Sequence, residues 1–534
     1  MKILHVMLEV ASGLSVYVRT LAQALTDADN PNHILSIRLE AHGLAAGQPG
    51  LHAVASDGIP HHRLSGIAAD ATDPRFLCSE PRTEALFADF LEQLRPEVVH
   101  FHSLSGMPAS LLQIAHVLGY RTVLTLHDVC ALCRPYRFFI RDDGRECAGP
   151  LNGHACIDCN PELDPAWLLE RFRYAREVAG QCCDAVVAVS DYIRDAHAVY
   201  GYGEGIRVIR HGVGLAGLDR PRRIERPPRL LFVGGLQAQK GLHVLLEALR
   251  GIPPDLYRLD VYGGGSHHQF EAMIRPRFPD LPMRYRDRYP AEAVAEVMDG
   301  HDLLIVPALG GEAAGMVLQE ARARCLPVIC SDAGGLPEYV REGETGWLYP
   351  RHDTAALGRL LRARLDRHDE LQDAADAMFR RPARRFADVA EEYRGLYAEV
   401  GHVAKKRIHR RAATASDPVL HAAMRFSPAR HVQARMAEIV AELQRRGATE
   451  VWLFGTGIVA DLVDPCLGAA KIGVLGYFDN DPVRQGGQRL GRPICPPRAA
   501  DGHAIIVAAS SHAQIAPQLQ DLGFAPDDIL LAYP

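Results

Sequence analysis

The sequence of 534 residues has no run of about 18 apolar residues free of charged side chains, which is the length that a membrane-spanning helix requires. Its beginning, MKILHVMLEV, lacks the apolar core and the small-residue cleavage site of a signal peptide, so it predicts a first β-strand. A surplus of positive charge is also absent. The formal net charge is −6, and general nucleic-acid binding is therefore not expected. Together these absences predict a cytoplasmic protein.

Apolar residues make up 48% of the chain, enough for a full core, and the length suggests roughly two to four domains. Short apolar runs alternate with longer helical patterns up to about residue 205; the runs are KILHVML, HILSIRL, VVHFH, RTVLTLH and AVVAVS. A second series starts near Arg229 and includes LLFVGG, RLDVYGGG, DLLIVP and PVIC. Strands alternating with helices indicate parallel sheets, so we predict two Rossmann-like domains that face each other across a cleft. Apolar residues at helical spacing from Arg384 to Val400 predict a helix that closes the second unit.

Two glutamates, Glu312 and Glu320, are separated by seven residues in the middle of the second series. The runs LLIVP before them and LPVIC after them predict a strand, a loop, a helix and another strand. Gly315, Met316 and Val317 then fall where the helix begins, and a helix N-terminus with free N–H groups suits phosphate. Carboxylates beside it can accept hydrogen bonds from sugar hydroxyls. The stretch therefore predicts a nucleotide-sugar site.

A short loop, Ser12-Gly13-Leu14-Ser15, joins the first strand to the first helix. It has the form of a phosphate cradle, although a single glycine in this place also fits a plain turn. A different segment, residues 401–430, is basic and poor in large aliphatic residues. It predicts a solvated linker; a patch that contacts anionic lipid is the alternative.

A third unit of about 100 residues spans 431–534, a reasonable size for an independent α/β domain. Its strand VWLFGTG brings Gly455 and Gly457 to the start of a helix, and Asp479 ends the next strand about 20 residues later. This is the dinucleotide fingerprint, with glycines for phosphate and an acid for ribose hydroxyls. Binding of NAD or another nucleotide and a purely structural role both stay open. The unit has no Tyr-x-x-x-Lys, so a free-standing epimerase or dehydrogenase is not expected.

Five of the twelve cysteines stand within residues 130–160, two pairs of them as Cys-x-x-Cys. In a cytoplasmic protein such density indicates a metal site better than disulfides. Free thiols are the alternative. An iron–sulfur cluster is less favoured because nothing else in the chain suggests electron transfer, and His154 is a possible substitute ligand.

Seven motifs in order carry a resemblance to a known family. They are the first strand with Gly13, VVHFHS with TLHD, AVSDYIRD, VIRHGV, VGGLQAQKG, the segment from Glu312 to Glu320, and LPVICSDAGGLPEYVREGETGWLYP. Over residues 1 to about 400 the chain resembles the GT-B glycosyltransferases of family 4, which are retaining and depend on nucleotide sugars. The resemblance implies an acceptor-side domain at 1–208 with a Cys-rich insertion at 130–160, and a donor-binding domain at 209–400.

The resemblance also implies roles for individual residues. Lys240 would contact the donor diphosphate, where a point charge is physically sensible. Glu312 would bind the hexose hydroxyls, Glu320 the ribose hydroxyls, and the N–H groups of residues 315–317 the sugar and phosphate. His127 would contact the donor sugar as the active-site histidine, and His102, one strand earlier, would lie on the acceptor side. Two departures from the family are Gly235, where an arginine is usual, and the small Ala314.

The implied reaction is transfer of a hexosyl group from a nucleotide sugar to a hydroxyl of a glycan or lipid-linked acceptor, with retention and without a catalytic metal. No second carboxylate is obviously placed as a nucleophile, so a covalent glycosyl-enzyme is not expected. In many surface-polysaccharide members the cysteine pattern corresponds to Cys133, Cys147, Cys156 and Cys159, which implies a structural zinc. The third unit resembles small Rossmann-like domains of polysaccharide-biosynthesis proteins. Alternatives are an NAD-binding accessory or sensing protein and a non-catalytic scaffold with a degenerate transferase fold.

Overall fold

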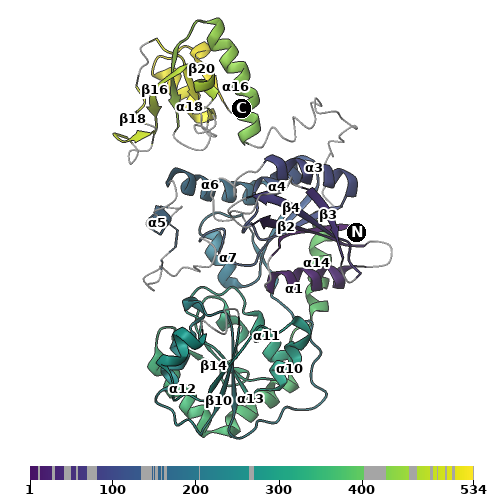
Figure 1. The fold of residues 1–534 in the computed structure, drawn as a ribbon. Coiled ribbons are helices and arrows are strands. Elements are labelled where there is room, and N and C mark those ends of the chain that lie inside the picture. Colours follow the sequence, from purple (N-terminus) through teal and green to yellow (C-terminus); the bar gives the residue numbers. More distant parts are fainter. Residues whose placement is uncertain are drawn as a thin grey trace.

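The computed structural model places most of the chain in three α/β units (Figure 1). It describes residues 1–534 except 10–12, 27–30, 41–49, 56–57, 69–80, 134–146, 148, 151–153, 158, 161–164, 204, 264–269, 402–427, 456–462, 464–465, 481–484, 490, 499–501, 508–511 and 533–534. The basic segment predicted at 401–430 therefore lies almost wholly outside the described residues. None of the described helices is long and apolar enough to cross a membrane.

The first sheet has eight strands in the order β3-β4-β2-β1-β5-β6-β7-β8, and all but β3 run parallel. The strands are β1 (Ile3–Leu8), β2 (His33–Glu40), β3 (Gly50–Val54), β4 (His61–Ala68), β5 (Val98–His102), β6 (Arg121–Leu126), β7 (Ala185–Ala188) and β8 (Arg207–Val208). The helices between them are α1 (Gly13–Leu25), α3 (Pro81–Leu94), α4 (Ser110–Val117), α5 (His154–Ile157), α6 (Pro165–Cys182) and α7 (Asp191–Ala198). Strands β1 and β5 are buried almost throughout because helices cover both faces of a parallel sheet.

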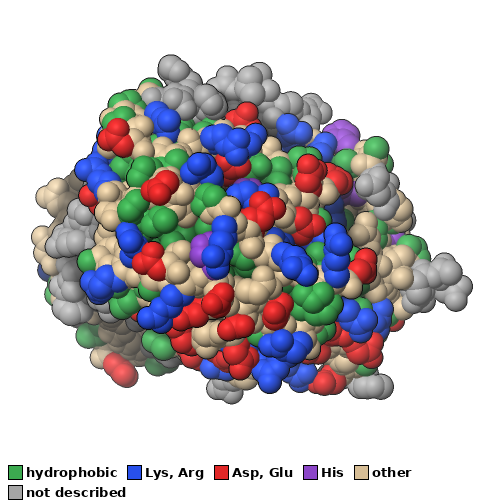
Figure 2. Space-filling view, turned by 90° about the horizontal axis from the view of Figure 1, so that it is seen from below, with side chains coloured by type: hydrophobic (Ala, Val, Ile, Leu, Met, Phe, Trp, Pro, Cys, Tyr) green, Lys and Arg blue, Asp and Glu red, His purple; other side chains and the backbone are tan. Residues whose placement is uncertain are grey.

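The second sheet is fully parallel, with the order β11-β10-β9-β12-β13-β14. The strands are β9 (Arg229–Val233), β10 (Arg258–Tyr262), β11 (Met283–Arg286), β12 (Leu303–Val306), β13 (Val328–Ser331) and β14 (Gly346–Tyr349). Its main helices are α8 (Leu242–Leu249), α10 (Val294–Asp299), α11 (Met316–Ala323), α12 (Thr354–Asp366) and α13 (His368–Arg380). The face of this unit seen in Figure 2 intersperses Lys and Arg with Asp and Glu, so no patch of one sign dominates it.

Helix α14 (Phe386–Gly401) corrects one expectation. The sequence predicts that this segment closes the second unit, but its buried residues share a core with α1 of the first unit. The hydroxyl of Tyr397 lies 2.7 Å from Nδ1 of His100, and that of Tyr393 lies 2.9 Å from Oγ1 of Thr125. The helix forms as predicted. Its expected packing is wrong because helical periodicity marks a buried face without saying what covers that face.

A third sheet lies in the last part of the chain, with the order β17-β18-β16-β15-β19-β20. The strands are β15 (Glu450–Phe454), β16 (Gly473–Phe478), β17 (Gln488–Arg489), β18 (Arg492–Cys495), β19 (Ile505–Val507) and β20 (Ile529–Leu531), with helices α16 (Pro428–Arg445) and α18 (His512–Asp521). Strands β16, β15 and β19 are parallel neighbours, and Trp452 stacks on Phe478 in the core on one face. The boundaries assigned to the three units from the sequence stay predictions.

Candidate active site

Lys240 and Glu312 meet at the carboxyl edge of the second sheet. Nζ of Lys240 lies 2.5 Å from Oε1 of Glu312, and both side chains are about two-thirds or more buried. Lys240 ends a 3-10 turn, and Gly241 follows it with φ +73°. A Cβ on Gly241 would lie 1.7 Å from the carbonyl oxygen of Pro307, so only glycine lets the loop approach the end of β12 this closely. The predicted diphosphate and hexose contacts are therefore side by side.

Helix α11 begins at Met316, shortly after Glu312 in the chain. Gly315 is its N-cap residue with φ 52°, a left-handed conformation that glycine adopts readily. A Cβ there would also lie 2.6 Å from Cδ2 of Leu336. The first N–H groups of a helix have no partner within the helix, and those of Met316 and Val317 stand at this position. The sequence prediction that these residues form a helix N-terminus is confirmed by the structure.

Glu320 is half-buried one turn further along α11. Burial raises the pKa of its carboxyl to about 7. Its charge in turn raises the pKa of Tyr289, although burial is the larger cause for the tyrosine. Among the described residues no cation pairs with Glu320, and a carboxylate of this kind is suited to hydroxyl groups of a ligand.

The raised pKa predicts how stability depends on pH. The folded protein holds a proton on Glu320 that the unfolded chain releases near pH 4.5, so the free energy of unfolding falls as pH rises from 4.5 to about 7. The contribution is up to about 3 kcal/mol. Glu320→Gln should remove this slope and raise the thermal midpoint at pH 8, measured without ligand. The control is Glu292→Gln at an exposed position. An unchanged slope in Glu320→Gln would contradict the assignment.

The first unit forms the other side of the predicted cleft. Gly13, the first residue of α1, packs against the start of α11, since a Cβ on it would lie 2.7 Å from Sδ of Met316. The structure thus joins the two glycine positions that the sequence singled out, Gly13 and Gly315, through Met316. A larger residue at 13 would require the side chain of Met316 to move.

His127 and His102 are hydrogen-bonded at the ends of β6 and β5. Nε2 of His127 lies 3.2 Å from Nδ1 of His102. The ring of Tyr17 lies 4.8 Å from that of His127, and the ring of His211 lies 5.6 Å from it. Burial lowers the pKa of both His127 and His102 well below the usual value, with neighbouring histidines adding to the effect. Both rings are therefore neutral at physiological pH, and His102 is buried rather than open to an acceptor.

A carboxylate that the sequence analysis missed, Glu338, ties the units together. Its oxygens accept the N–H groups of Asp191 and Tyr192 at 2.9 and 2.8 Å, which are the first residues of α7. Arg210 lies 3.2 Å from the same carboxylate. Glu338 thus caps a helix of the first unit from a segment of the second. Its signal was present in the sequence, because it lies in the LPEY segment of a family motif, but capping across an interface is not visible there.

The two departures from the family have structural explanations. A Cβ on Gly235 would lie 1.9 Å from Oε1 of Gln237, so the amide of Gln237 fills the space where a longer side chain would start. Ala314 is 2% exposed and belongs to the main core, so its small side chain does not form a pocket wall. Neither residue removes the ion pair or the helix N-terminus.

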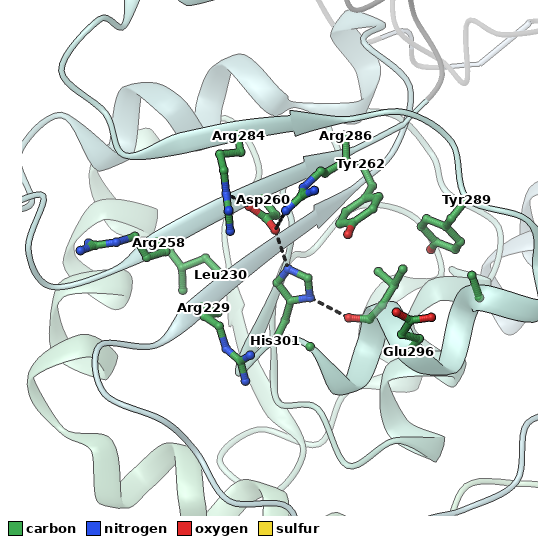
Figure 3. A pocket seen from close by; sticks show the side chains of 13 residues that line it. Arg229, Leu230, Arg258, Asp260, Tyr262, Arg284, Arg286, Tyr289, Glu296 and His301 are labelled. Carbon is green, nitrogen blue, oxygen red and sulfur yellow. Dashed lines mark hydrogen bonds and ion pairs between the residues drawn. The ribbon is translucent and has the colours of Figure 1, made fainter.

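A cavity of about 450 Å³ lies between α10 and the strands β10 and β11 (Figure 3). Asp260 stands in it between Arg284, Arg286 and His301, at 3.1, 3.6 and 3.4 Å. Burial raises the pKa of Asp260, but the hydrogen bond from His301 and the arginine charges outweigh burial and lower it. The cations of this cavity are thus already partly neutralised. Its lining includes Tyr289, the neighbour of Glu320, but none of the predicted donor-binding residues.

The four predicted zinc ligands lie near one another, but their sulfur atoms do not form a group of mutually close ligand atoms. The thiols of Cys133, Cys147 and Cys159 lie close enough to Cys156 to add to the effect of burial, which raises its pKa to about 12. Sγ of Cys147 lies 3.4 Å from both the N–H group and the carbonyl oxygen of Gly149, accepting from the first and donating to the second. Within the described residues, however, three or more ligand atoms come within 4.8 Å of one another only at His5, His100 and His102.

In the third sheet the fingerprint residues lie at the ends of neighbouring parallel strands. Gly455 follows β15 with φ 98° and donates its N–H to the carbonyl oxygen of Phe478 at 2.7 Å. Asp479 follows β16 and is 8% exposed. Gly457 lies outside the described residues, as does most of the helix expected after it.

Comparisons with known proteins agree with this geometry. The family model for "Glycosyltransferase Family 4" matches residues 11–216, and the model for "Glycosyl transferases group 1" matches residues 219–379. Phosphatidyl-myo-inositol mannosyltransferase of Mycobacterium leprae is 31% identical over 223 residues, 40% of this chain and 59% of the relative. Amylovoran biosynthesis glycosyltransferase AmsK of Erwinia amylovora is 29% identical over 171 residues, 30% of this chain and 41% of the relative. The chain spans about half the length of these curated relatives.

Solved structures give the same fold. Sucrose-phosphate synthase from Thermosynechococcus elongatus matches with a TM-score of 0.57 at 18% identity, covering 75% of this chain and 98% of the other. The Anabaena protein HepE, solved in complex with UDP, matches with a TM-score of 0.52 at 16% identity, covering 75% and 100%.

Two facing Rossmann-like units, with the ion pair and the helix N-terminus on one and the histidines on the other, define a glycosyltransferase of GT-B fold. The chain belongs to glycosyltransferase family 4, as the sequence motifs predict.

Proposed function

We propose that the protein is a retaining hexosyltransferase that uses a nucleotide sugar as donor. The observation that carries the proposal is the Lys240–Glu312 ion pair at the open N-terminus of α11. In the absence of ligand the two charges satisfy each other. A donor would insert between them, so that the diphosphate takes Lys240 and the helix N–H groups, and the hexose hydroxyls take Glu312.

The chemistry that follows is stabilisation of charge on the leaving diphosphate. Lys240 and the N–H groups of residues 316 and 317 would stabilise the negative charge that develops there as the glycosidic bond breaks. Glu320, which is half-buried and forms no ion pair with any described residue, would accept hydrogen bonds from the ribose. HepE was solved with UDP and with UDP-glucose, which supports a nucleotide sugar as the ligand class.

The acceptor is proposed to be a hydroxyl of a glycan or of a lipid-linked glycan in cell-surface glycoconjugate synthesis, on the cytoplasmic side with peripheral membrane contact. The names of two relatives support it: one is a phosphatidyl-myo-inositol mannosyltransferase, the other acts in amylovoran biosynthesis.

The experiment is a screen of UDP-, GDP- and ADP-sugars by thermal shift and by slow hydrolysis, followed by proton NMR of the anomer first released. One donor should raise the thermal midpoint and release a sugar with the donor's anomeric configuration. An inverted product would reject retention. No shift and no hydrolysis with any donor would favour the alternative of a degenerate scaffold.

A second binding function is proposed for the third sheet, because Gly455 and Asp479 stand at the ends of adjacent parallel strands. NAD or another nucleotide would lie across this edge, with Asp479 on the ribose. The same thermal-shift screen should include NAD and NADH. Asp479→Ala should abolish any shift with them and leave the shift with the sugar donor intact. The absence of any NAD shift in the unaltered protein would leave this unit a scaffold.

A structural zinc on Cys133, Cys147, Cys156 and Cys159 is proposed for the Cys-rich insertion. The four residues are neighbours and include an N–H···S bond, and four thiolates are the set that zinc prefers. Zinc there would hold the segment together and take no part in the transfer step.

The corresponding prediction concerns metal content. The purified protein should hold about one zinc per chain by elemental analysis. Cys156→Ser combined with Cys159→Ser should lower this below half and lower the thermal midpoint. The matched control is Cys466→Ser in the third unit, which should leave the zinc content unchanged. Less than half an atom of zinc in the unaltered protein would contradict the proposal.

A further inference from the structure

Three histidines, His5, His100 and His102, share one face of the first sheet. His5 and His100 are register partners on the neighbouring strands β1 and β5, and His102 follows two positions later on the same face. All three are fully buried. A buried imidazole needs hydrogen-bond partners, so its bonds show what it does there.

The bonds form a chain that ends at the active-site histidine. Nδ1 of His5 lies 3.0 Å from Nε2 of His102, and Nδ1 of His102 lies 3.2 Å from Nε2 of His127. His100 stands outside the chain, because its two nitrogens bond Tyr397 and Thr125, each at 2.7 Å. Three imidazoles therefore connect the core of the sheet to the cleft.

Each ring in the chain carries a single proton. Burial lowers the pKa of His5 to about 3 and the pKa of His102 and His127 well below the usual value. A neutral imidazole has one N–H donor and one acceptor nitrogen. The three tautomers are then linked, because every bond needs one donor and one acceptor. Two arrangements of the protons are therefore possible. Either each bond is donated in the direction from His5 toward His127, or each bond is donated in the direction from His127 toward His5.

The buried end of the chain decides between them. Nε2 of His5 is buried and has no hydrogen-bond partner among the described residues. If His127 donated to His102 and His102 donated to His5, Nε2 of His5 would carry an N–H group without a partner among the described residues. In the other arrangement it is an unsatisfied acceptor, and orphaned buried N–H groups are rarer than under-satisfied acceptors. His5 therefore donates from Nδ1 to His102, and His102 donates from Nδ1 to His127.

We infer that the hydrogen-bonded chain of His5, His102 and His127, here called the relay, fixes His127 as a neutral Nδ1–H donor facing the ligand. His5 and His102 act as positioning residues. His127 then donates a hydrogen bond to an oxygen of the sugar or phosphate and cannot act as a general base, because its acceptor nitrogen is occupied. The identity of that oxygen rests on the proposed function; the tautomer does not. The hydrogen bond that one ring nitrogen makes sets which nitrogen of a histidine carries the proton, and here the partner is a second imidazole.

A metal ion on His5, His100 and His102 is the competing occupant of this cluster. Their ligand atoms lie within 4.8 Å of one another. A divalent cation would, however, have to break one of the two bonds of His102 and one of the two bonds of His100, and the partners of these rings are neutral hydroxyls and imidazoles. Burying two uncompensated charges there is costly. The relay keeps every observed bond.

The test is ¹⁵N NMR of histidine-labelled full-length protein, with His127 assigned by loss of its signals in His127→Gln. His127 should show a protonated Nδ1 and an unprotonated Nε2 at pH 7. His5→Leu removes the first donor and should let the tautomers of His127 interconvert. It should lower kcat about 10-fold with KM nearly unchanged. His5→Asn keeps an N–H donor near the position of Nδ1 and should restore both readouts.

His197→Leu is the matched control, because His197 is equally buried and, among the residues that the structure describes, its ring hydrogen-bonds only to the carbonyl oxygen of Ile193 within α7. It should leave the His127 signals unchanged. An unprotonated Nδ1 on His127, or unchanged His127 signals in His5→Leu, would overturn the relay. So would metal-induced shifts at His5 and His100 on addition of zinc. If His5→Leu does not fold, the unaltered protein and His5→Asn still decide. The expected tautomer without any transfer activity would reject the proposed function and keep the relay.

Discussion

Replacing Lys240 with alanine is expected to lower kcat/KM for the sugar donor by roughly 10²–10³-fold, the cost of losing one preorganised group that stabilises developing negative charge. Lys240 is the cation paired with Glu312 in the proposed donor site. Its loss also leaves Glu312 as an unpaired carboxylate next to the incoming diphosphate. The measurement is steady-state kinetics with the donor found in the screen.

Two variants control this prediction. Lys240→Arg keeps the charge and should recover part of the activity. Arg359→Ala removes an exposed cation from the same unit and should leave kcat/KM unchanged. A loss of less than threefold in Lys240→Ala would place the diphosphate elsewhere.

Replacing Glu338 with alanine is expected to cause the largest loss of stability. Its carboxylate accepts two N–H groups of α7 and pairs with Arg210, and the substitution leaves the helix start and the cation without this partner. The free energy of unfolding should fall by about 2–3 kcal/mol. That corresponds to a drop of roughly 4–8 °C in the thermal midpoint, and KM for the donor should rise because the two walls of the cleft lose their fixed orientation.

Glu344→Ala provides the comparison. Glu344 forms exposed ion pairs with Arg341 and Arg381 in the same region, and such pairs contribute little. Its midpoint should stay within about 1–2 °C of the unaltered protein. Equal effects of the two substitutions would mean that Glu338 is not a clamp between the units.

Much of the donor half could be predicted from the sequence because its chemistry is local. The apolar runs around Glu312 and Glu320 predict a strand and a helix, and Gly315 predicts the turn between them. The positions of both glutamates can therefore be predicted from one segment. Lys240 is added by a second segment of the same type. These residues are brought together by the general rule that parallel strands present their carboxyl ends at one edge.

The rest depends on contacts between distant segments. His5 looks like any polar residue within a strand until the register of β1 and β5 places it beside His100 and His102. Glu338 caps α7 from about 150 positions away, and no spacing in the sequence encodes that. His102 is assigned to the acceptor side by resemblance, but it is buried and lies 3.2 Å from His127 through its Nδ1, a contact that the sequence does not predict.

The central claim is that the donor diphosphate binds at Lys240 and the start of α11. The most direct measurement is calorimetric titration of UDP, GDP and ADP into the unaltered protein, Lys240→Ala and Arg359→Ala. We predict that at least one of these nucleotides binds the unaltered protein and Arg359→Ala equally well, and that its affinity falls at least tenfold in Lys240→Ala. Equal affinity of that nucleotide for all three proteins would contradict the account.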